Sequence, residues 1–335
     1  MRRRVRNVCG VVAAACSVLL PAVGTSPVPA LAATTVIACP HAAYGVRYYA
    51  PGAGKTVALT FDDGPGRSTT PILRELAREH VEATFFNLGL YEAQSPKKVR
   101  TEDHTGFALG DHTWDHPDLT LMSRKQQARE IDRERRKQAS ITGAYPCMLR
   151  PPYGNYNSAT LRLAQRRGMR VWYWSVDTED WKASGSDDAS WIKRIVARAE
   201  AGGTMRHPVI LMHNQIGGNP ATVDALPTII KYYKSHGYRF VDLYGRTGHP
   251  VIRHISPAAG PAAGGTRVTI TGHDFRGVRR VVFGRSAGSK LKIESGRKLL
   301  VTSPRHAAGR VHLRIVTTFG TSPKRARDMF RFRAA

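Results

Sequence analysis

Carboxylates, imidazoles and an arginine recur at the ends of successive apolar runs between residues 62 and 213 of this 335-residue chain. They are Asp62 and Asp63, His112 and His116, Arg150, Asp177 and Asp180, and His213. One such pair alone would indicate little. Polar residues that follow several strands in turn are typical of a catalytic face built from strand ends. The pattern therefore predicts a metal-dependent hydrolase.

The first motif places two carboxylates, Asp62 and Asp63, between an apolar run and a Gly64-Pro65 break. Adjacent side chains point to opposite faces of a regular strand, so both carboxylates can face one site only where the strand ends. Two close carboxylates repel each other unless a cation lies between them. We expect one to bind a metal while the other acts as a base. The alternative at this motif is a solvated turn.

The second motif contains His112 and His116, four residues apart. On a helical turn this spacing puts both imidazoles on the same face. Two histidines and one carboxylate form a ligand set that leaves coordination positions open for water and substrate, as a hydrolytic zinc site requires. We therefore expect a divalent metal ion, with Zn²⁺ favoured and Co²⁺ or Mn²⁺ as alternatives.

Further motifs suggest groups that act around the metal. Arg150 is a candidate to fix the charge state of a nearby carboxylate. Two prolines follow it and lack an N–H, so the amide of Tyr153 becomes a candidate donor to an oxyanion. An aspartate at position 177 or 180 that pairs with His213 would raise the pKa of the imidazole and suit it to act as a general acid.

Aromatic residues flank the Asp177 motif on both sides. Trp181 is expected to wall an acetyl methyl group or to stack on a sugar ring. Trp172 and Trp174 belong to the preceding apolar run, and we assign them to core packing because aromatic residues on strands are more often core than ligand platform.

Apolar, β-branched runs alternate with amphipathic stretches between residues 55 and 243, which predicts parallel strands joined by crossover helices. Seven strands are expected at residues 57–61, 83–88, 108–111, 148–150, 171–176, 209–213 and 239–243. Helices are expected at residues 72–79, 123–143, 158–167, 189–201 and 222–235, and Ser123 with Gln126 suits a capping box. This succession favours a barrel over an open sheet.

In this order the five motifs resemble those of the NodB-type polysaccharide deacetylases, carbohydrate esterase family 4, over residues 57–243. The resemblance implies an α/β fold, a distorted (β/α)7-type barrel. It also implies a role for each residue: Asp62 as general base, Asp63, His112 and His116 as metal ligands, Arg150 orienting the base, the Tyr153 amide facing the oxyanion, Leu211 and Trp181 lining an acetate pocket, and His213 as the acid, tuned by Asp177 or Asp180, with Asp180 favoured.

The N-terminus has the pattern of a secretory signal peptide. Four arginines among the first six residues precede an apolar stretch at residues 11–20, which is too short to span a bilayer, and small residues at 30–32 suit cleavage. We expect a signal peptide over residues 1–32, a tail over residues 33–54 and no membrane span. The protein is expected to be secreted, either released or associated with the cell wall.

Cysteine usage is consistent with export. Cys9 and Cys16 lie in the predicted signal peptide, which leaves Cys39 and Cys147 as a lone pair in the mature chain. A disulfide can persist in an oxidising compartment. We treat a Cys39–Cys147 bridge as a hypothesis, with two free thiols as the alternative.

Beyond residue 250, short β-rich runs separated by glycine and proline turns predict a small all-β sandwich. Strands are expected at residues 267–271, 278–283, 299–302, 311–317 and 329–332. The Ser256-Pro257 pair, the glycines at 260, 264 and 265, and the run 281–284 resemble an IPT/TIG immunoglobulin-like domain. We place that domain at residues 251–335, after a deacetylase domain at residues 55–245.

Charge is distributed unevenly along the chain. The net charge is +26, from 51 Lys and Arg against 25 Asp and Glu. Residues 251–335 contribute +15 of this, from 18 basic residues against Asp274, Glu294 and Asp328. A basic module on an exported enzyme favours binding to an anionic cell-wall polymer. Nucleic acid is the rival partner, and predicted export argues against it.

These features favour an N-deacetylase that acts on GlcNAc-containing polymers, peptidoglycan or chitin. An O-deacetylase acting on acetylated xylan is the alternative from the same family. A non-catalytic protein that binds wall carbohydrate is a third interpretation, disfavoured because no motif residue is missing. An amine leaving group needs protonation by His213 far more than an alkoxide does, so leaving-group chemistry separates the first two.

Overall fold

The computed structural model describes residues 39–183, 185–215, 217–275, 277–317 and 320–334. The predicted signal peptide at residues 1–32 lies outside these ranges. Within them, every helix falls short of the length or the hydropathy that a membrane span needs.

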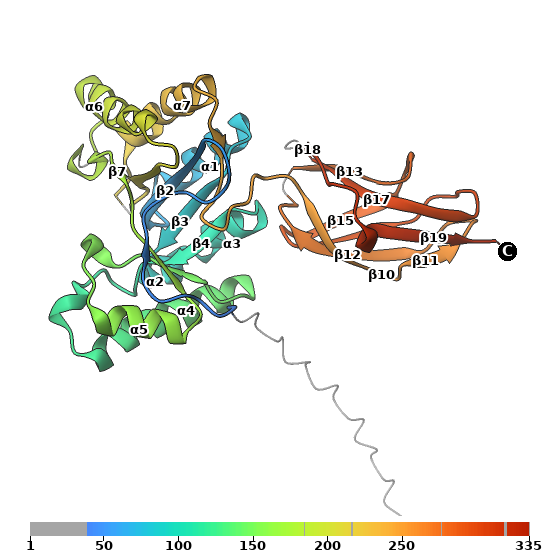
Figure 1. Cartoon of the computed structure of the whole chain (residues 1–335), viewed down its shortest axis with the longest axis horizontal. Helices are drawn as coiled ribbons and strands as arrows, with labels where there is room; N and C mark the ends of the chain where they lie inside the picture. Colours follow the sequence, from blue (N-terminus) through green and yellow to red (C-terminus); the bar gives the residue numbers. More distant parts are fainter. Residues whose placement is uncertain (1–38, 184, 216, 276, 318–319, 335) are drawn as a thin grey trace, which may run out of the picture. The chain divides into compact units, whose positions relative to one another are not determined.

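A nine-stranded parallel sheet forms the centre of the first part of the chain (Figure 1). Its strands are β1 (Val46–Arg47), β2 (Thr56–Gly64), β3 (Ala83–Asn87), β4 (Ala108–Asp111), β5 (Met148–Leu149), β6 (Arg170–Trp172), β7 (Val176–Asp177), β8 (Val209–His213) and β9 (Arg239–Phe240). The strand order is β1-β6-β5-β4-β3-β2-β8-β7, and β9 pairs with β2. β3 and β8 are buried along their whole length, because helices cover the outer face of a parallel sheet.

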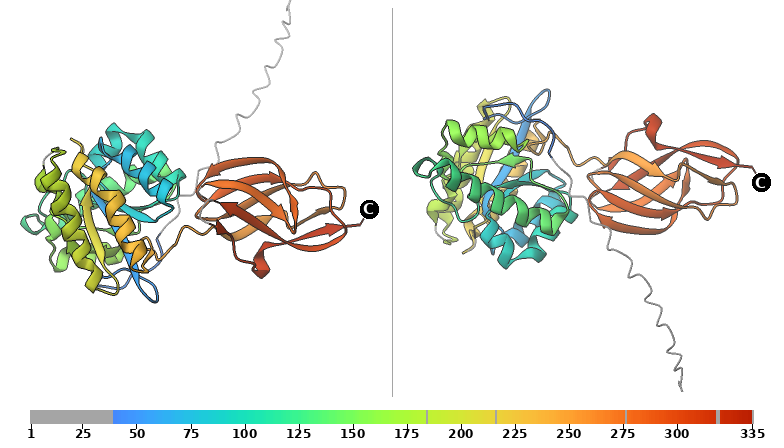
Figure 2. Two further views of the ribbon diagram at one scale, coloured as in Figure 1. Left: turned by 90° about the horizontal axis from the view of Figure 1, so that it is seen from above. Right: turned by 90° about the horizontal axis from the view of Figure 1, so that it is seen from below.

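Helices lie around the outside of this sheet (Figure 2). They are α1 (Thr69–Glu79), α2 (Gly89–Gln94), α3 (Pro96–His104), α4 (Arg124–Thr142), α5 (Ser158–Arg166), α6 (Ala189–Glu200) and α7 (Pro220–Ser235). Side chains of β2, β3 and β8 share one buried cluster with side chains of α1 and α7, among them Leu59, Phe85, Ile210, Leu76 and Ile229. The apolar periodicity of the sequence therefore forms a single core between sheet and helices.

The sheet curls into a barrel because a three-residue segment joins its two ends. β6 and β7 lie near opposite ends of the strand order, yet Trp172 ends one and Val176 begins the other. The four Cα–Cα steps between them span at most roughly 14 Å. The Tyr173 N–H donates to Arg47 O at 2.8 Å, on the β1 side, and the Ser175 N–H donates to Val209 O at 3.1 Å, on the β8 side.

The structure corrects several sequence expectations. The single strand predicted at residues 171–176 is wrong, because the chain changes its pairing partner at residues 173–175 and forms β6 and β7 instead. The strand predicted at 239–243 is shortened to β9. Helices α2 and α3 were not predicted. α3 buries only Val99 and Glu102, so its sequence carries no apolar periodicity.

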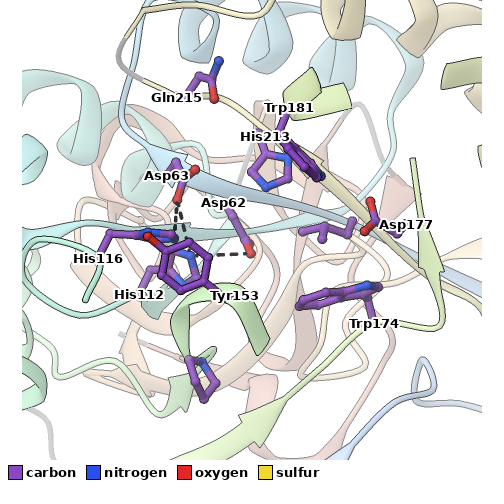
Figure 3. Close-up of a pocket in the computed structure, with 12 residues that line it drawn as sticks. Asp62, Asp63, His112, His116, Tyr153, Trp174, Asp177, Trp181, His213 and Gln215 are labelled. Carbon is purple, nitrogen blue, oxygen red and sulfur yellow. Dashed lines mark ion pairs between the residues drawn. The ribbon is translucent and has the colours of Figure 1, made fainter. Parts of the chain in front are cut away.

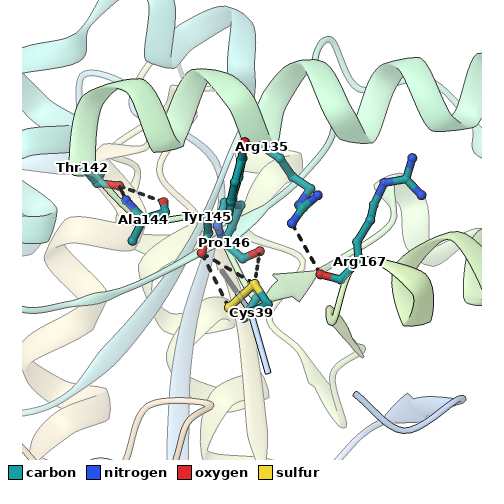
Figure 4. Close-up of a disulfide and its surroundings, with 8 residues drawn as sticks. Cys39, Arg135, Thr142, Ala144, Tyr145, Pro146 and Arg167 are labelled. Carbon is teal, nitrogen blue, oxygen red and sulfur yellow. Dashed lines mark hydrogen bonds between the residues drawn. A yellow bond between two sulfur atoms is a disulfide. The ribbon is translucent and has the colours of Figure 1, made fainter. Parts of the chain in front are cut away.

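A disulfide ties the N-terminal tail to the barrel (Figure 4). It joins Cys39 to Cys147, just before β5, with the two Cα atoms 5.3 Å apart. Gly168 has φ +69° at the turn before β6, and a Cβ atom there would lie 2.5 Å from Pro40 O. The tail thus packs closely on the barrel before β1 pairs with β6.

The C-terminal part forms two mostly antiparallel sheets. Its strands are β10 (Val251–Ser256), β11 (Ala259–Pro261), β12 (Arg267–His273), β13 (Val278–Phe283), β14 (Ser286–Ala287), β15 (Ser289–Ser295), β16 (Lys298–Thr302), β17 (Gly309–Thr317), β18 (Gly320–Thr321) and β19 (Met329–Arg333). Buried side chains from both sheets, including Ile270 and Val301 from one and Phe283 and Ile315 from the other, form one core. The predicted all-β sandwich is confirmed; the exact domain boundaries stay predictions.

Replacing Cys39 and Cys147 by serine is expected to lower the free energy of unfolding by about 2–4 kcal/mol, because a bridge across a sequence separation of 108 residues restricts the unfolded chain. Thermal unfolding of the double variant and the parent protein, without reductant, measures the difference. Reductant should destabilise the parent and leave the variant unchanged. Equal melting temperatures without reductant would contradict the expectation.

Candidate active site

A cavity of about 500 Å³ opens where several parallel strands of the barrel end (Figure 3). The residues that line it are Asp62, Asp63, His112, His116, Pro151, Tyr153, Trp174, Asp177, Trp181, Leu211, His213 and Gln215. They come from β2, β7 and β8 and from the segments that follow β4, β5, β6, β7 and β8. Most of the residues singled out in the sequence therefore meet in one pocket.

Asp63, His112 and His116 form a cluster in this pocket that could hold a metal ion. Each offers one ligand atom, and these atoms all lie within 4.8 Å of one another. The Oδ1 atom of Asp63 is 3.3 Å from Nε2 of His112 and 3.4 Å from Nε2 of His116. Figure 3 shows the three side chains converging.

The backbone around these residues is not helical, so the expectation of a helical turn for the histidine pair is wrong. Thr113 has φ +73° and His116 has φ +69°, both in the left-handed region. The Thr113 N–H donates to Asp111 Oδ1 at 2.7 Å, and the His116 N–H donates to Thr113 Oγ1 at 3.2 Å. These side-chain acceptors stabilise a tight loop that brings the imidazoles together. Asp63 reaches the same site with φ +65°.

A backbone carbonyl fixes the ring of His112. Nδ1 of His112 lies 2.6 Å from Arg150 O, and a carbonyl can only accept, so Nδ1 carries the proton. In the neutral form of the ring the lone pair is then on Nε2, which faces Asp63. Metal-ligating histidines are commonly oriented in this way. Burial lowers the pKa of His112, but the charges of Asp62 and Asp63 outweigh burial and raise it.

The three residues fit a divalent cation. Asp63 Oδ1 is buried and accepts no hydrogen bond in the described part of the chain. Burial would raise the pKa of Asp63, but the neighbouring imidazole of His112 outweighs it and holds that pKa well below its usual range. Burial, followed by the charge of His112, lowers the pKa of His116 to about 4. The cluster thus offers a charged carboxylate and a neutral imidazole, which are metal-binding forms.

Asp62 is held by a fully buried guanidinium. Nη1 of Arg150 donates to Asp62 Oδ1 at 2.8 Å, and the exposed fraction of Arg150 is 0%. The same nitrogen donates to Thr60 Oγ1 at 2.9 Å. The other oxygen of Asp62, Oδ2, lies 3.8 Å from His112 Nε2. Asp62 therefore has one oxygen fixed by Arg150 and the other turned toward the candidate metal ligands.

His213 pairs with Asp180. Nδ1 of His213 lies 2.7 Å from Asp180 Oδ1, and its backbone N–H donates to Asp180 Oδ2 at 2.8 Å. Burial lowers the pKa of His213, but the charge of Asp180 outweighs burial and raises it to about 9. The imidazole is therefore protonated at neutral pH. Its charge contributes stability below the ordinary pKa, and this contribution is lost as the pH rises through about 9.

Two residues that sequence reasoning missed support this aspartate. Thr222 Oγ1 donates to Asp180 Oδ2 at 2.5 Å, and Asn219 Nδ2 donates to Asp180 O at 3.0 Å. Both belong to the start of α7, where Asn219 is the N-cap and Pro220 follows it. The Asn-Pro helix-start signal could have located them. Asp177 has a different role, since its Oδ1 accepts the Glu179 N–H at 2.8 Å.

Asp62 and His213 stand side by side at the end of the sheet. They are register partners on the neighbouring parallel strands β2 and β8, which lie about 4.8 Å apart. The Arg150-bound carboxylate and the protonated imidazole thus face the same cavity at one level.

Apolar and aromatic side chains complete the walls. Leu211 is 3% exposed, whereas Tyr153 and Trp181 are 62% and 48% exposed at the rim. Trp174 packs against the buried cluster that contains Trp172, as expected, and it also lines the cavity, which was not expected. Trp172 is buried as expected. Trp174 reaches the cavity because the chain leaves β6 at residue 173 and no longer follows strand alternation.

Four fully buried carboxylates lie in the elements around the histidine loop, and no pattern in the sequence indicated them: Glu92, Glu102, Asp111 and Glu134. Burial raises the pKa of Asp111 to about 7 and that of Glu102 to about 8. Burial also raises the pKa of Glu92 and Glu134 well above the usual range. Protonated carboxyl groups can donate as well as accept hydrogen bonds, which suits a buried polar cluster.

Comparison with known proteins agrees with this geometry. The family described as polysaccharide deacetylase matches residues 50–172, and the IPT/TIG domain matches residues 250–324. The peptidoglycan-N-acetylglucosamine deacetylase PgdA of Listeria monocytogenes is 39% identical over 195 residues, which are 57% of this chain and 39% of that protein. A peptidoglycan-N-acetylglucosamine deacetylase of Bacillus cereus is 35% identical over 202 residues, 60% of this chain and 71% of the relative.

Solved structures show the same likeness. The Bc1960 peptidoglycan N-acetylglucosamine deacetylase has a TM-score of 0.56 and 34% identity, covering 60% of this chain and 91% of its own. A family 4 carbohydrate esterase from Streptomyces lividans in complex with acetate has a TM-score of 0.51 and 32% identity. The match covers 56% of this chain and 92% of the esterase chain. Barrel and site together define a family 4 carbohydrate esterase fold. The chain belongs to the polysaccharide deacetylase family and carries an IPT/TIG domain, which confirms both resemblances.

Replacing His112 or His116 by alanine is expected to weaken Zn²⁺ binding at least about 100-fold, because each supplies one of three ligand atoms and even residues that only orient ligands change affinity about 10–100-fold. Isothermal titration of Zn²⁺ into chelator-treated protein measures the affinity. His104→Ala, which removes an exposed histidine of α3, is the matched control and should bind normally. Unchanged affinity in the His112 and His116 variants would place the metal elsewhere.

Replacing Asp180 by asparagine is expected to lower the pKa of His213 from about 9 toward or below 6.5, because burial then acts without its main opposing charge. An NMR titration of the imidazole in metal-free protein measures this. Asp177→Asn removes the same charge without a contact to His213 and should change the titration little. A larger shift in the Asp177 variant would reverse the assignment of the partner.

Proposed function

We propose that this chain is a secreted, divalent-metal-dependent polysaccharide deacetylase that removes N-acetyl groups from GlcNAc-containing polymers, with peptidoglycan as the leading substrate and chitin as the second. The observation that supports the proposal most directly is that one cavity contains two separate pairs. One is a carboxylate held by Arg150, and the other is an imidazole held by Asp180. These pairs flank the Asp63–His112–His116 cluster. A base, an acid and a cation site are what amide hydrolysis needs.

Each of the site residues then has a role in one step of the reaction. Asp62 takes a proton from the attacking water, and Arg150 keeps the carboxylate oriented through Oδ1. The Tyr153 amide stabilises the oxyanion, and Leu211 and Trp181 enclose the acetyl methyl group. His213 gives its proton to the departing amine and regains one afterwards, with Asp180 stabilising the imidazolium.

Asp63, His112 and His116 would hold the cation, and the nitrogen-rich ligand set favours Zn²⁺, with Co²⁺ or Mn²⁺ as alternatives. When bound, the cation supplies Lewis-acid polarisation of the acetyl carbonyl and lowers the pKa of water.

The proposed substrate and the proposed location of the protein rest on different observations. The Listeria and Bacillus relatives are named as deacetylases of peptidoglycan N-acetylglucosamine, and the chain spans 39% of the length of the Listeria protein. A protonated His213 favours an amine leaving group over an alkoxide. The signal-peptide pattern and the Cys39–Cys147 disulfide support export, since disulfides persist in oxidising compartments. The basic C-terminal part supports association with an anionic wall polymer.

Acetate release by the zinc-loaded protein from peptidoglycan, chitooligosaccharide and acetylxylan tests the proposal. We expect release from the two N-acetylated substrates, with peptidoglycan first. Preference for acetylxylan would instead establish an O-deacetylase. Binding to all three polymers without acetate release would establish a non-catalytic carbohydrate-binding protein.

Asp62→Asn is expected to lower kcat by about 10² to 10⁴, the usual range for losing one general base, while Zn²⁺ affinity stays close to normal. His213→Ala should give a similar loss by removing the acid. Acetate release and metal content are measured on the same preparations. Near-normal turnover of the Asp62 variant would refute its role as base, and loss of metal from it would move it into the ligand set.

A further inference from the structure

Among the described residues, one face of the C-terminal sandwich carries arginines but no exposed acidic side chain. β13, β17 and β19 are neighbours in one sheet (Figure 1), and side chains alternate between its two faces. Residues such as Phe283, Leu313 and Phe330 point inward and are fully buried. The outward positions between them include five residues that we call the arginine face: Arg280, Arg310, Arg314, Arg331 and Arg333.

The cross-strand register places two of these arginines directly opposite each other. Arg310 on β17 is the cross-strand partner of Arg331 on β19. Side chains in such positions lie within about 5.5 Å at Cβ, where like charges destabilise a sheet. Arg333 follows on the same face, two residues after Arg331. The sheet therefore concentrates positive charge at a cost to its own stability, which suggests that something else compensates the charge.

Nothing in the described part of the sandwich compensates it. Arg280, Arg310, Arg331 and Arg333 form no ion pair and no side-chain hydrogen bond there. Arg314 donates only to a backbone carbonyl, that of Ser322, at 2.8 Å.

The acid just before β19 does not neutralise the face either. Asp328 is buried, with a side-chain exposed fraction of 1%. It already accepts hydrogen bonds from His312 and from the Arg325 N–H.

The opposite sheet differs in this respect. Lys292 on β15 and Lys298 on β16 pair with Glu294, at 3.5 Å and 3.0 Å. Arg253 on β10, Arg267 on β12 and Lys290 on β15 also belong to that sheet and form no ion pair within the described residues. The two sheets differ in arrangement. The opposite sheet holds a carboxylate between two lysines, whereas the arginine face sets two guanidinium groups directly opposite each other with no carboxylate in reach.

We propose that the arginine face binds a flexible phosphodiester polyanion, the chemistry of wall teichoic acid, and so holds the enzyme on the wall that it deacetylates. This inference rests on the proposed function for its location. Guanidinium groups bind phosphate oxygens through two parallel N–H bonds, and a flexible chain can place successive phosphates on a flat row of them.

Nucleic acid fits this face less well. Single strands are held by aromatic side chains that stack on bases, and the outward positions of β13, β17 and β19 hold no Phe, Tyr or Trp. Duplexes are usually read by a helix or a two-stranded ribbon in a groove. The helical structure in the described residues after 250 is the three-residue η5 (Ala326–Asp328).

The test compares two triple variants of the full mature chain. Arg310→Gln, Arg331→Gln and Arg333→Gln remove three charges from the arginine face, and Lys290→Gln, Lys292→Gln and Lys298→Gln remove three from the opposite sheet. Binding to purified poly(glycerol phosphate) is measured over a range of salt concentrations. Co-sedimentation with cell walls is measured before and after hydrofluoric acid has removed their phosphodiester polymers.

The arginine variant is expected to bind poly(glycerol phosphate) at least about tenfold more weakly and to show a salt slope smaller by about 2, at roughly 0.7 per lost phosphate contact. The lysine variant should lose less than about twofold. The parent protein should sediment with intact walls and much less with stripped walls. Equal losses in both variants, or full binding to stripped walls, would overturn the proposal.

Two further measurements separate this proposal from its rivals. Arginine-dependent binding that is tighter for single-stranded or duplex DNA than for poly(glycerol phosphate) would assign the face to nucleic acid instead. Acetate release from a soluble chitooligosaccharide should be unchanged in both variants. If the parent protein released no acetate but still bound the polyanion through the arginine face, the proposed enzymatic function would fail while the binding surface stood.

Discussion

The site depends on one buried guanidinium. The side chain of Arg150 fixes Asp62, its backbone carbonyl fixes the ring of His112, and its Nη2 donates to Tyr173 O at 3.0 Å. One residue thus joins the proposed base, a candidate metal ligand and the segment that closes the barrel. Removing it would leave the Asp62 carboxylate buried without a partner, which costs about 3–5 kcal/mol in proteins where such pairs have been broken.

Around this residue the proposed base and the proposed acid have different electrostatic environments. Asp62 and His213 are register partners, yet one is matched to a positive charge and the other to a negative one. Arg150 donates to the Asp62 carboxylate at 2.8 Å, and Asp180 favours the imidazolium form of His213. The proposed base and the proposed acid can therefore coexist in one cavity, because each has a buried residue of opposite charge beside it.

The sequence predicted the barrel and most of the residues that meet in the pocket because both follow local patterns. Apolar runs that end in Asp62, His112 or His213 indicate where strands end and where polar side chains begin. The pairing of the ends of the sheet was not predictable in this way. The run at residues 171–176 is apolar and aromatic except for Ser175, and it contains no Gly or Pro to indicate that the chain changes partners at residues 173–175. The buried carboxylates Glu102 and Glu134 look like ordinary surface residues of charged helices.

The pairing of β1 with β6 has a consequence for the order of folding. Val46 forms its ladder with Val171, and Cys39 is bridged to Cys147. The first strand of the described chain therefore has no partner until much of the barrel sequence has been made. Contacts between segments far apart in sequence form slowly, because the loop entropy is lost before the contacts are gained. The segment from Cys39 to Arg47 is therefore expected to join the barrel late, after the other strands have assembled.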